Sequence, residues 1–289
     1  MDMFLQSLAQ GLLIGSTYGL ISLGMGLTYS VSGVINFAHG DLLSLGMFLA
    51  LACFTAFGLD PYISVFITFP VMVAFGALVY RFLIRPLVGS HVLMVIQLTL
   101  GLTFIVQNGL LMTFGGMSHR VPSKIEADLI LLGDSVVLRS ALAVAFAVSV
   151  ALAGLLYFVL TRTDTGRSIR AVHQNAKAAA LMGISVDRVR TLTFALGVGL
   201  LAIAAVLLTP GTPLHPSQGL RYTVISLMVM VLGGMTNFAG ILLGGLLFGI
   251  AEAFGTVYVS GTSGMIVPYA MFILVLLLRP EGLLKRRAS

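Results

Sequence analysis

The sequence of 289 residues has little charge, a single cysteine and no tryptophan. Charged residues make up 9% of the chain, whereas about 25% is typical of soluble domains. With 58% hydrophobic residues, the 16 basic and 10 acidic side chains are too few to cover a soluble fold of this length. The scarcity of charge therefore excludes a soluble enzyme, a disordered protein and a nucleic-acid binder.

Other absences narrow the chemistry. Cys53 has no second cysteine to pair with, so an intrachain disulfide and a cysteine metal cluster are excluded. The sequence lacks a Gly-x-x-x-x-Gly-Lys-[Ser/Thr] loop, a Gly-x-Ser-x-Gly elbow and a His-Glu-x-x-His pair. We therefore expect no ATP site in this chain, no catalytic residues, no cofactor and no metal.

The sequence is rich in long uncharged runs. Positions 3–38 contain no charged residue, and only Glu252 interrupts the run between Arg221 and Arg279. A spanning helix needs about 20 apolar residues, so we predict an all-α polytopic membrane protein with about eight to nine transmembrane helices, several of them short or broken by glycine. The expected spans are 8–30, 36–57, 62–83, 93–115, 139–160 and 191–209, followed by two long or three short spans.

The basic residues predict the orientation. They gather near Arg81 and Arg85, in segment 161–190 and in the tail Lys285-Arg286-Arg287, and such clusters are typical of cytoplasmic segments. Segments 117–138 and 211–221 should then face outside. This alternation favours nine spans, an outside N-terminus and a cytoplasmic C-terminus, with eight spans as the alternative. The start of the chain lacks the basic n-region of a signal peptide, so we expect the first run to remain as a helix.

Glycines recur at a spacing of four residues. Gly11, Gly15 and Gly19 would share one helix face, and Gly240/Gly244 and Gly245/Gly249 repeat the pattern. Small residues at this spacing let membrane helices approach closely. They indicate close packing within the subunit, with a contact between subunits as the alternative.

Segment 161–190 is the longest polar stretch. We expect a turn over 163–168, a short helix over 168–175 and a second helix over 176–182 that Asn175 caps and Gly183 ends. Two interpretations stay open: a solvated loop that satisfies the positive-inside rule, and a docking helix for a cytoplasmic partner.

Several motifs resemble one family. Lys177-Ala178-Ala179-x-x-x-Gly183 has the spacing of the EAA motif, the cytoplasmic coupling segment of ABC-importer permeases. The wider segment 166–184 is similar to the LivH-type branched-chain amino acid permeases. The other similar segments follow in family order: Ser16-Thr17-Tyr18-Gly19-Leu20, Ile35-Asn36-Phe37-Ala38-His39-Gly40-Asp41, Thr99-Leu100-Gly101-Leu102 and Gly233-Gly234-Met235 with Gly240. Two positions depart from the family: Lys177 stands where the general motif has glutamate, and Thr236 where a glycine is expected.

The resemblance implies a single permease domain over 1–289, with 161–190 as its cytoplasmic coupling loop. It implies an ATP-driven importer in a bacterial inner membrane for branched-chain or related hydrophobic amino acids. The implied partners are ABC ATPase subunits, a second homologous permease subunit, a periplasmic binding protein and membrane lipid. The coupling residues would be Arg167, Arg170, Lys177, Ala178, Ala179 and Gly183.

Polar residues inside the apolar runs are candidates for the translocation path: Asn36, His39, Asp41, Gln107, Asn108 and Glu252. Most have an alternative. His39-Gly40-Asp41 could be a polar turn or a broken helix start, with Asp41 near a helix N-terminus. Gln107 and Asn108 could bond between helices, and Glu252 could take an interfacial position between two short helices.

Three other functions are weighed against this one. A permease of the same family could carry urea or short amides. A stand-alone secondary transporter would require inverted repeats, and no convincing repeat is visible. An intramembrane enzyme would need a nucleophile with a base, and Ser263 has no nearby histidine in the sequence.

Overall fold

Helices dominate the computed structural model, which describes residues 2–123, 129–132, 136–259, 264–279 and 282–283. Seven of the helices described there are long and apolar enough to cross a membrane. They are α1 (Asp2–Ser32), α2 (His39–Phe57), α3 (Val65–Leu78), α4 (Val92–Phe114), α5 (Ser140–Arg162), α8 (Val186–Leu208) and α10 (Phe238–Tyr258). The all-α polytopic prediction is confirmed.

Two shorter helices follow in the same half of the chain, α9 (Gly219–Gly233) and the apolar α11 (Ile266–Leu278). Of α9, α10 and α11, only α10 is long and apolar enough to cross a membrane. The span α3 continues through a π-helical turn, η1 (Val79–Ile84), and a 3₁₀ turn, η2 (Arg85–Leu87), where Pro86 ends it.

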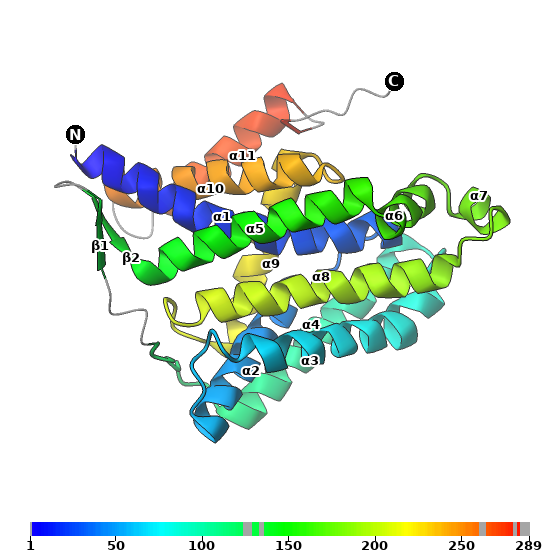
Figure 1. The fold of residues 1–289 in the computed structure, drawn as a ribbon, viewed down its shortest axis with the longest axis horizontal. Helices are drawn as coiled ribbons and strands as arrows, with labels where there is room; N and C mark the ends of the chain where they lie inside the picture. The colour runs from blue at the N-terminus through cyan, green and yellow to red at the C-terminus, as the bar shows by residue number, and fades with distance from the viewer. Residues whose placement is uncertain (1, 124–128, 133–135, 260–263, 280–281, 284–289) are drawn as a thin grey trace.

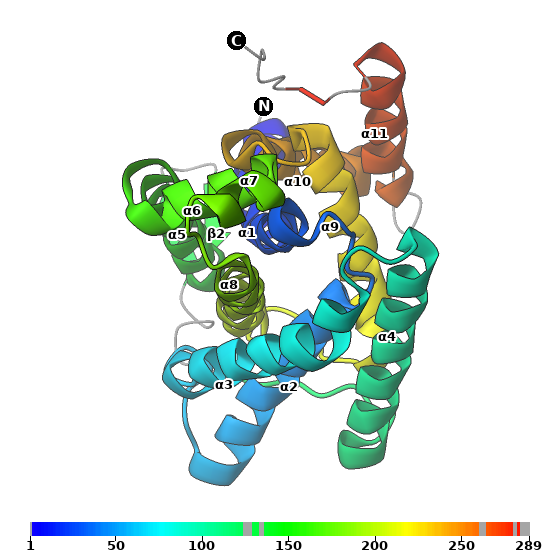
Figure 2. The same ribbon diagram turned by 90° about the vertical axis from the view of Figure 1, so that its right-hand side faces the viewer.

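Helix α1 runs through the centre of the molecule, between α10, α8, α5 and α9 (Figures 1 and 2). Its hydroxyl side chains donate to carbonyls of the preceding turn, as Ser16 does to Leu13 and Ser22 to Tyr18 at 2.7 Å. These bonds satisfy polar groups without a partner from another helix. A central apolar environment can therefore hold a helix that is rich in serine and threonine.

The glycine stripe of α1 packs against the glycine stripe of α10. A Cβ atom at Gly11 would lie 2.6 Å from the Cα atom of Ile250, and one at Gly15 would lie 2.6 Å from the carbonyl oxygen of Gly245. These positions have no room for a side chain. Close packing within the subunit, the first interpretation, is confirmed for this stripe.

The loops gather at two ends of the helix bundle. At one end, here called the basic end, Nδ1 of His173 lies 2.5 Å from the carbonyl oxygen of Ser30, and Arg85 pairs with Asp187 at 2.5 Å. Gly282 packs at the same end, beside the turn between α9 and α10. Figure 2 views the molecule from this end, with α7 (Ala176–Leu181) in front.

The opposite end holds the segments that the basic residues place outside. The side chain of Gln6 bonds the backbone of Val137 at 2.7 and 3.0 Å, and His119 forms a β-bridge with Leu214. Residues 119, 137 and 214 thus lie at the end away from the basic loops. Residues 6 and 282 lie at opposite ends, as any odd number of crossings requires.

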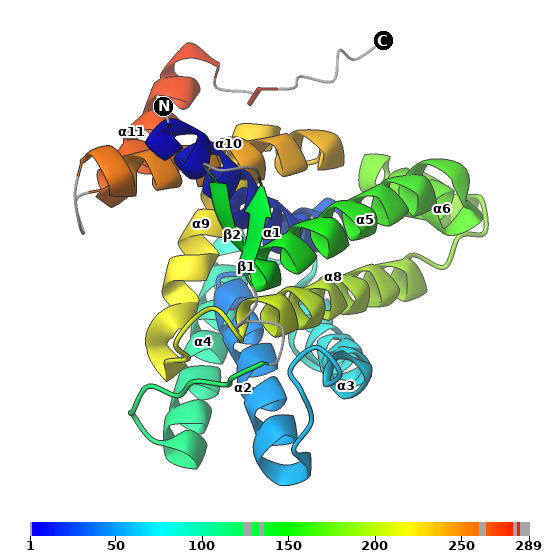
Figure 3. The same ribbon diagram turned by 60° about the vertical axis from the view of Figure 1, so that its left-hand side comes forward.

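The structure corrects several boundaries. A two-stranded antiparallel hairpin, β1 (Leu129–Leu132) with β2 (Val136–Arg139), lies in a part of the chain for which no helix or strand is predicted from the sequence. It lies beside α1 at the N-terminal end (Figure 3). Helix α6 (Asp164–Gln174) replaces the expected turn over 163–168, because the Thr163 hydroxyl accepts from the amide of Gly166 and caps the helix there. Helix α8 likewise begins before residue 191.

Candidate functional site

The most unusual feature of the backbone is the break between α1 and α2. The chain leaves α1 at Gly33, whose φ of 68° suits glycine, and runs without helical structure to Ala38. Helix α2 then begins inside the bundle, because Nε2 of His39 lies 2.9 Å from the carbonyl oxygen of Ile21, about three turns before the end of α1. The predicted span over 36–57 is therefore three residues shorter, and its start is buried.

Two of the predicted path residues, Asp41 and Gln107, meet at this buried start, and Asn36 and His39 lie on the backbone that leads into it. The side chain of Asn36 accepts from the amide of Ala38 at 3.0 Å, and Gln107 of α4 donates to Oδ1 of Asp41 at 3.1 Å. We call Asn36, His39, Asp41 and Gln107, together with Thr223 of α9, the polar junction.

Thr223 holds the broken segment in place. Its hydroxyl donates to the carbonyl oxygen of Phe37 at 3.2 Å and accepts from the amide of Gly40 at 2.9 Å. The hydroxyl of Thr103 reaches the same carbonyl at 3.5 Å. The non-helical backbone is thus bonded to neighbouring helices, as irregular backbone at membrane depth requires.

The N-termini of α2 and α9 converge on Asp41. A Cβ atom at Gly40 would collide with the carbonyl oxygen of Gly219, and one at Gly219 would collide with the Asp41 carboxylate. Glycine is therefore required at both positions. Because the N-terminus of a helix carries a partial positive charge, two of them stabilise a negative group here. This arrangement agrees with a role of Asp41 in stabilising a helix N-terminus. It also places the Asp41 carboxylate inside the bundle, between two helix N-termini.

Some polar atoms of the junction lack a partner among the described residues: Nδ2 of Asn36, Nδ1 of His39 and Oδ2 of Asp41. The three residues are 3%, 0% and 1% exposed. An unsatisfied buried polar group costs about 1–3 kcal/mol, so a hydrogen bond between each of these atoms and a further polar group would be favourable.

A second polar pair flanks the junction. Arg221, in the first turn of α9, pairs with Glu252 of α10 at 3.1 Å. The Glu252 side chain is 11% exposed and that of Arg221 is 52% exposed. The sequence placed Arg221 at the end of an outside segment, whereas the structure puts it in a helix beside Gly219. Its position at the edge of a 57-residue run broken by one carboxylate is the signal that could have identified the pair.

Asn108 does not join this group. Its side chain is exposed and donates to the carbonyl oxygen of Phe104 in its own helix at 2.8 Å. Neighbouring residues on a helix point about 100° apart, so Gln107 and Asn108 cannot both face the junction.

At the basic end, α6 and α7 form the expected pair of short helices. Asn175 caps α7 by accepting from the amide of Ala178 at 3.0 Å, and Gly183 follows the helix with a φ of 83°. Ile169 and Val172 are buried beneath α6. The capping role of Asn175 and the terminating role of Gly183 are confirmed.

The predicted coupling residues divide into two groups. Arg167, Lys177, Ala178 and Gly183 are exposed, and Arg167 pairs with Asp164. Arg170 is half-buried and Ala179 is buried, so Ala179 supports α7 from beneath. The sequence prediction missed Leu181 and Met182, which are 89% and 83% exposed at the tip of α7. Two exposed apolar residues in a polar segment are the signal for them.

Some expectations fall outside the described residues, namely those on Ser263 and on the basic tail 285–287. Among the described residues, no group of His, Cys, Asp and Glu side chains could hold a metal ion. At Thr236 the chain still closes a tight turn, in which the amide of Asn237 donates to the carbonyl oxygen of Gly234 at 2.6 Å.

Comparison with known proteins identifies the family. The family model "Branched-chain amino acid transport system / permease component" matches residues 7–276. The permease protein BraD of the high-affinity branched-chain amino acid transport system of Pseudomonas aeruginosa is 33% identical over 297 residues, covering 98% of this chain and 96% of BraD. LivH of Escherichia coli K12, from a system of the same description, is 33% identical with the same coverage.

A more distant similarity is limited to part of the chain. The ribose import permease protein RbsC of Bacillus subtilis is 36% identical over 89 residues, covering 30% of this chain and 27% of RbsC. No solved structure is significantly similar. The full-length matches show that the chain belongs to the family of branched-chain amino acid transport system permease components.

Proposed function

We propose that this chain is a transmembrane permease subunit of an ATP-driven importer for branched-chain or related hydrophobic amino acids. The family match across residues 7–276 carries the proposal. The absence of a P-loop from the sequence is consistent with it, because the chain then needs ATPase partners. The solute would arrive from a periplasmic binding protein, and a second permease subunit would complete the path.

The exposed surface of α6 and α7 is the proposed ATPase docking site, with 161–190 as the coupling loop. Leu181 and Met182 offer exposed apolar side chains to an apolar surface of the ATPase, and Arg167, Lys177 and Gly183 are exposed in the same segment. Lys177 stands where the general motif has glutamate, so the contact would not depend on a carboxylate at this position.

The polar junction and the Arg221–Glu252 pair are the proposed sites on the translocation path. An amino acid carries a carboxylate and an ammonium group, and both need polar partners inside a membrane. A half-exposed guanidinium at membrane depth is unfavourable against lipid, so we assign Arg221 to the path, where it would contact the solute carboxylate. The unpartnered Oδ2 of Asp41 would accept a hydrogen bond from the ammonium group of the solute.

The structure offers a mechanical link between the two sites. His173 of α6 contacts the carbonyl oxygen of Ser30 at 2.5 Å, only three residues before Gly33 opens the break. A movement of α6 would therefore pull on the segment that positions Asn36 and Asp41. This link depends on packed contacts between neighbouring elements.

The proposed orientation follows the basic end. It carries the exposed Arg162, Arg167, Lys177 and Arg188, so we place it in the cytoplasm of a bacterium, with the C-terminus on that side.

Reconstitution tests the substrate assignment. The chain is co-expressed with a partner permease, two ATPases and the binding protein of the same system, and uptake of labelled leucine into proteoliposomes is measured. Isoleucine and valine should compete with leucine, whereas urea and acetamide should not. Uptake that urea or acetamide inhibits as strongly as valine would instead support the short-amide alternative.

A further inference from the structure

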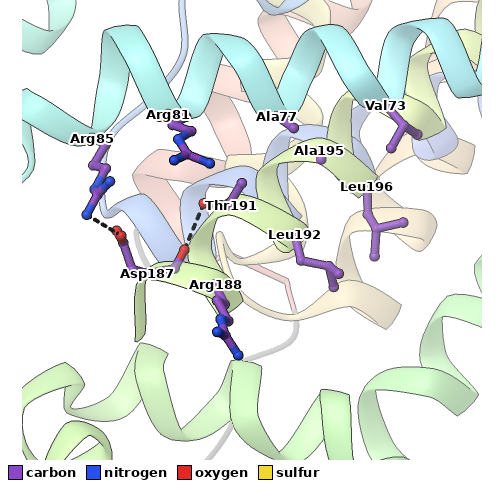
Figure 4. A pocket seen from close by; sticks show the side chains of 10 residues that line it. All are labelled: Val73, Ala77, Arg81, Arg85, Asp187, Arg188, Thr191, Leu192, Ala195 and Leu196. Carbon is purple, nitrogen blue, oxygen red and sulfur yellow. Dashed lines mark hydrogen bonds and ion pairs between the residues drawn. The ribbon is translucent and has the colours of Figure 1, made fainter. Parts of the chain in front are cut away.

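A groove opens between α3 and α8 at the basic end, away from the polar junction and from the tip of α7. Its volume is about 730 Å³. The two helices pack tightly along one side of the groove, where a Cβ atom at Gly76 would lie 2.8 Å from Cβ of Val198. The groove runs beside this contact, with residues of both helices lining it (Figure 4).

The deep part of the groove is apolar. It is lined by Val73 and Ala77 of α3 and by Leu192, Ala195 and Leu196 of α8. All of them belong to segments that are long and apolar enough to cross a membrane. This part of the groove therefore lies at the depth of lipid acyl chains.

The mouth of the groove is basic. Arg81 and Arg85 follow Val73 and Ala77 at intervals of four residues, so one helix face changes from apolar to cationic over about 18 Å at 1.5 Å per residue. Arg85 pairs with Asp187 across the mouth at 2.5 Å. Arg81 has no ion-pair partner among the residues described, and its side chain extends between the two helices (Figure 4). Arg188 lines the rim, with its guanidinium directed away from α3.

We propose that this groove binds an anionic phospholipid, with its phosphate at Arg81 and Arg85 and an acyl chain along Ala77 and Leu196. Three arginines and one aspartate leave an excess of two positive charges at the mouth. A free phosphate would use only the mouth, and an acidic protein segment would leave the apolar part unexplained. A phospholipid matches both parts, and basic pockets between transmembrane helices are known to favour anionic headgroups.

Only the choice of membrane leaflet rests on the proposed function. The groove opens in the cytoplasmic leaflet if the basic end faces the cytoplasm. The anionic lipids of that leaflet would then be the available ligands. A bound lipid would join α3 to α8 beside Asp187, close to the start of the helix that follows the coupling loop.

Native mass spectrometry of the assembled complex, titrated with phosphatidylglycerol or phosphatidylcholine, tests the proposal. We expect the wild-type complex to retain phosphatidylglycerol in preference to phosphatidylcholine. The variant Arg81→Gln should weaken this retention about tenfold, the effect of one charge-assisted contact. Arg162→Gln, which removes an exposed arginine at the basic end but outside the groove, is the matched control and should retain the lipid like the wild type.

A second variant distinguishes binding of the whole phospholipid from binding of its headgroup alone. Ala77→Phe fills the apolar part and leaves Arg81 in place, so it should weaken phosphatidylglycerol retention and leave binding of glycerol phosphate unchanged. Equal retention of both lipids, or unchanged retention in Arg81→Gln and Ala77→Phe, would overturn the proposal. Loss of the ATPases from Arg81→Gln with lipid retention unchanged would identify the groove as a protein-docking site instead. Lipid retention is measured without transport, so a failure here is distinct from a failure of the proposed function.

Discussion

At the scale of single residues, the first turn of α9 connects the polar features of the membrane part. Gly219 lies against Asp41, Arg221 pairs with Glu252, and Thr223 bonds the broken segment at Phe37. One short helix therefore positions both the polar junction and the ion pair.

The pair Arg221–Glu252 gives the first prediction. Arg221→Gln should raise the KM for uptake about tenfold or more, because it removes one charge-assisted contact with the solute carboxylate. It also leaves the buried carboxylate of Glu252 unpaired, which lowers stability. The double variant Arg221→Gln/Glu252→Gln should recover thermal stability without recovering the KM. If both recover together, the pair is structural only.

Asp41 gives the second prediction. Asp41→Asn keeps an oxygen that accepts from Gln107 but removes the negative charge between two helix N-termini, so stability should fall by about 1–2 kcal/mol. Uptake should fall by about tenfold as well, because the proposed ammonium contact is weakened. Asn108→Ala is the control and should behave like the wild type, since that side chain bonds only its own helix. A wild-type rate of uptake in Asp41→Asn would assign Asp41 to the helix start alone.

At the scale of helices, the sequence was informative where hydrophobic runs and caps decide the structure. The uncharged runs predicted the positions of the first six long spans, although α1 and α8 begin five or six residues earlier than expected, and Asn175 and Gly183 predicted the limits of α7. The expected spans 8–30 and 36–57 left a gap where the structure has its break, but the bonds from Thr103 and Thr223 that hold the broken segment are long-range, and no local pattern reveals them. The early start of α6 depends on one cap at Thr163, and the hairpin on a Leu-rich and a Val-rich run that flank Gly133-Asp134.

The candidate site was also predicted only in part, because contacts between residues far apart in the sequence leave no local pattern. Asn36, His39 and Asp41 are close in the sequence, and their polarity inside an apolar run identified them. Arg221 lies 180 positions from Asp41 along the chain and was placed in a loop, because charge next to a turn normally indicates solvent. Only the packing of α9 against α2 brings the two residues into one region.

The contact of α1 with α10 gives the third prediction. Gly15→Leu should lower the free energy of unfolding by about 1–3 kcal/mol or prevent folding, because a side chain there meets the backbone of α10 at Gly245 and Leu246. Thermal unfolding of the purified protein measures the effect. Gly154→Leu on α5, where the space around the glycine is open, should unfold at the wild-type temperature. Equal temperatures for both variants would show that the two helices are not packed in this way.

The end of α7 gives the fourth prediction. Gly183→Pro removes the amide that donates to Ala180 and forbids the φ of 83°, so the tip of α7 should lose its shape. Uptake should fall strongly while the protein stays in the membrane and the ATPases still hydrolyse ATP. Gly183→Asn, which tolerates a positive φ, should retain most of the uptake. A bulky residue at the buried Ala179 should act like the proline, since it would lift α7 from its support.

At the scale of the whole molecule, the arrangement of the two ends agrees with an importer subunit. The basic end carries the exposed α6 and α7, and the opposite end carries the hairpin and the β-bridge between His119 and Leu214. Between them lie two helices that begin inside the bundle. A movement of α6 would reach this region through the contact of His173 with Ser30. The molecule thus places its proposed coupling surface and its proposed path on one continuous set of contacts.

The energy source of uptake distinguishes a subunit of an ATP-driven importer from a secondary transporter. Leucine uptake is measured in proteoliposomes of the assembled complex, either with ATP and binding protein present or with only a proton or sodium gradient. If the chain is a subunit of an ATP-driven importer, uptake should require ATP and binding protein together, and neither gradient should support it. Uptake by this chain alone, driven by an ion gradient without ATP, would contradict the proposed function.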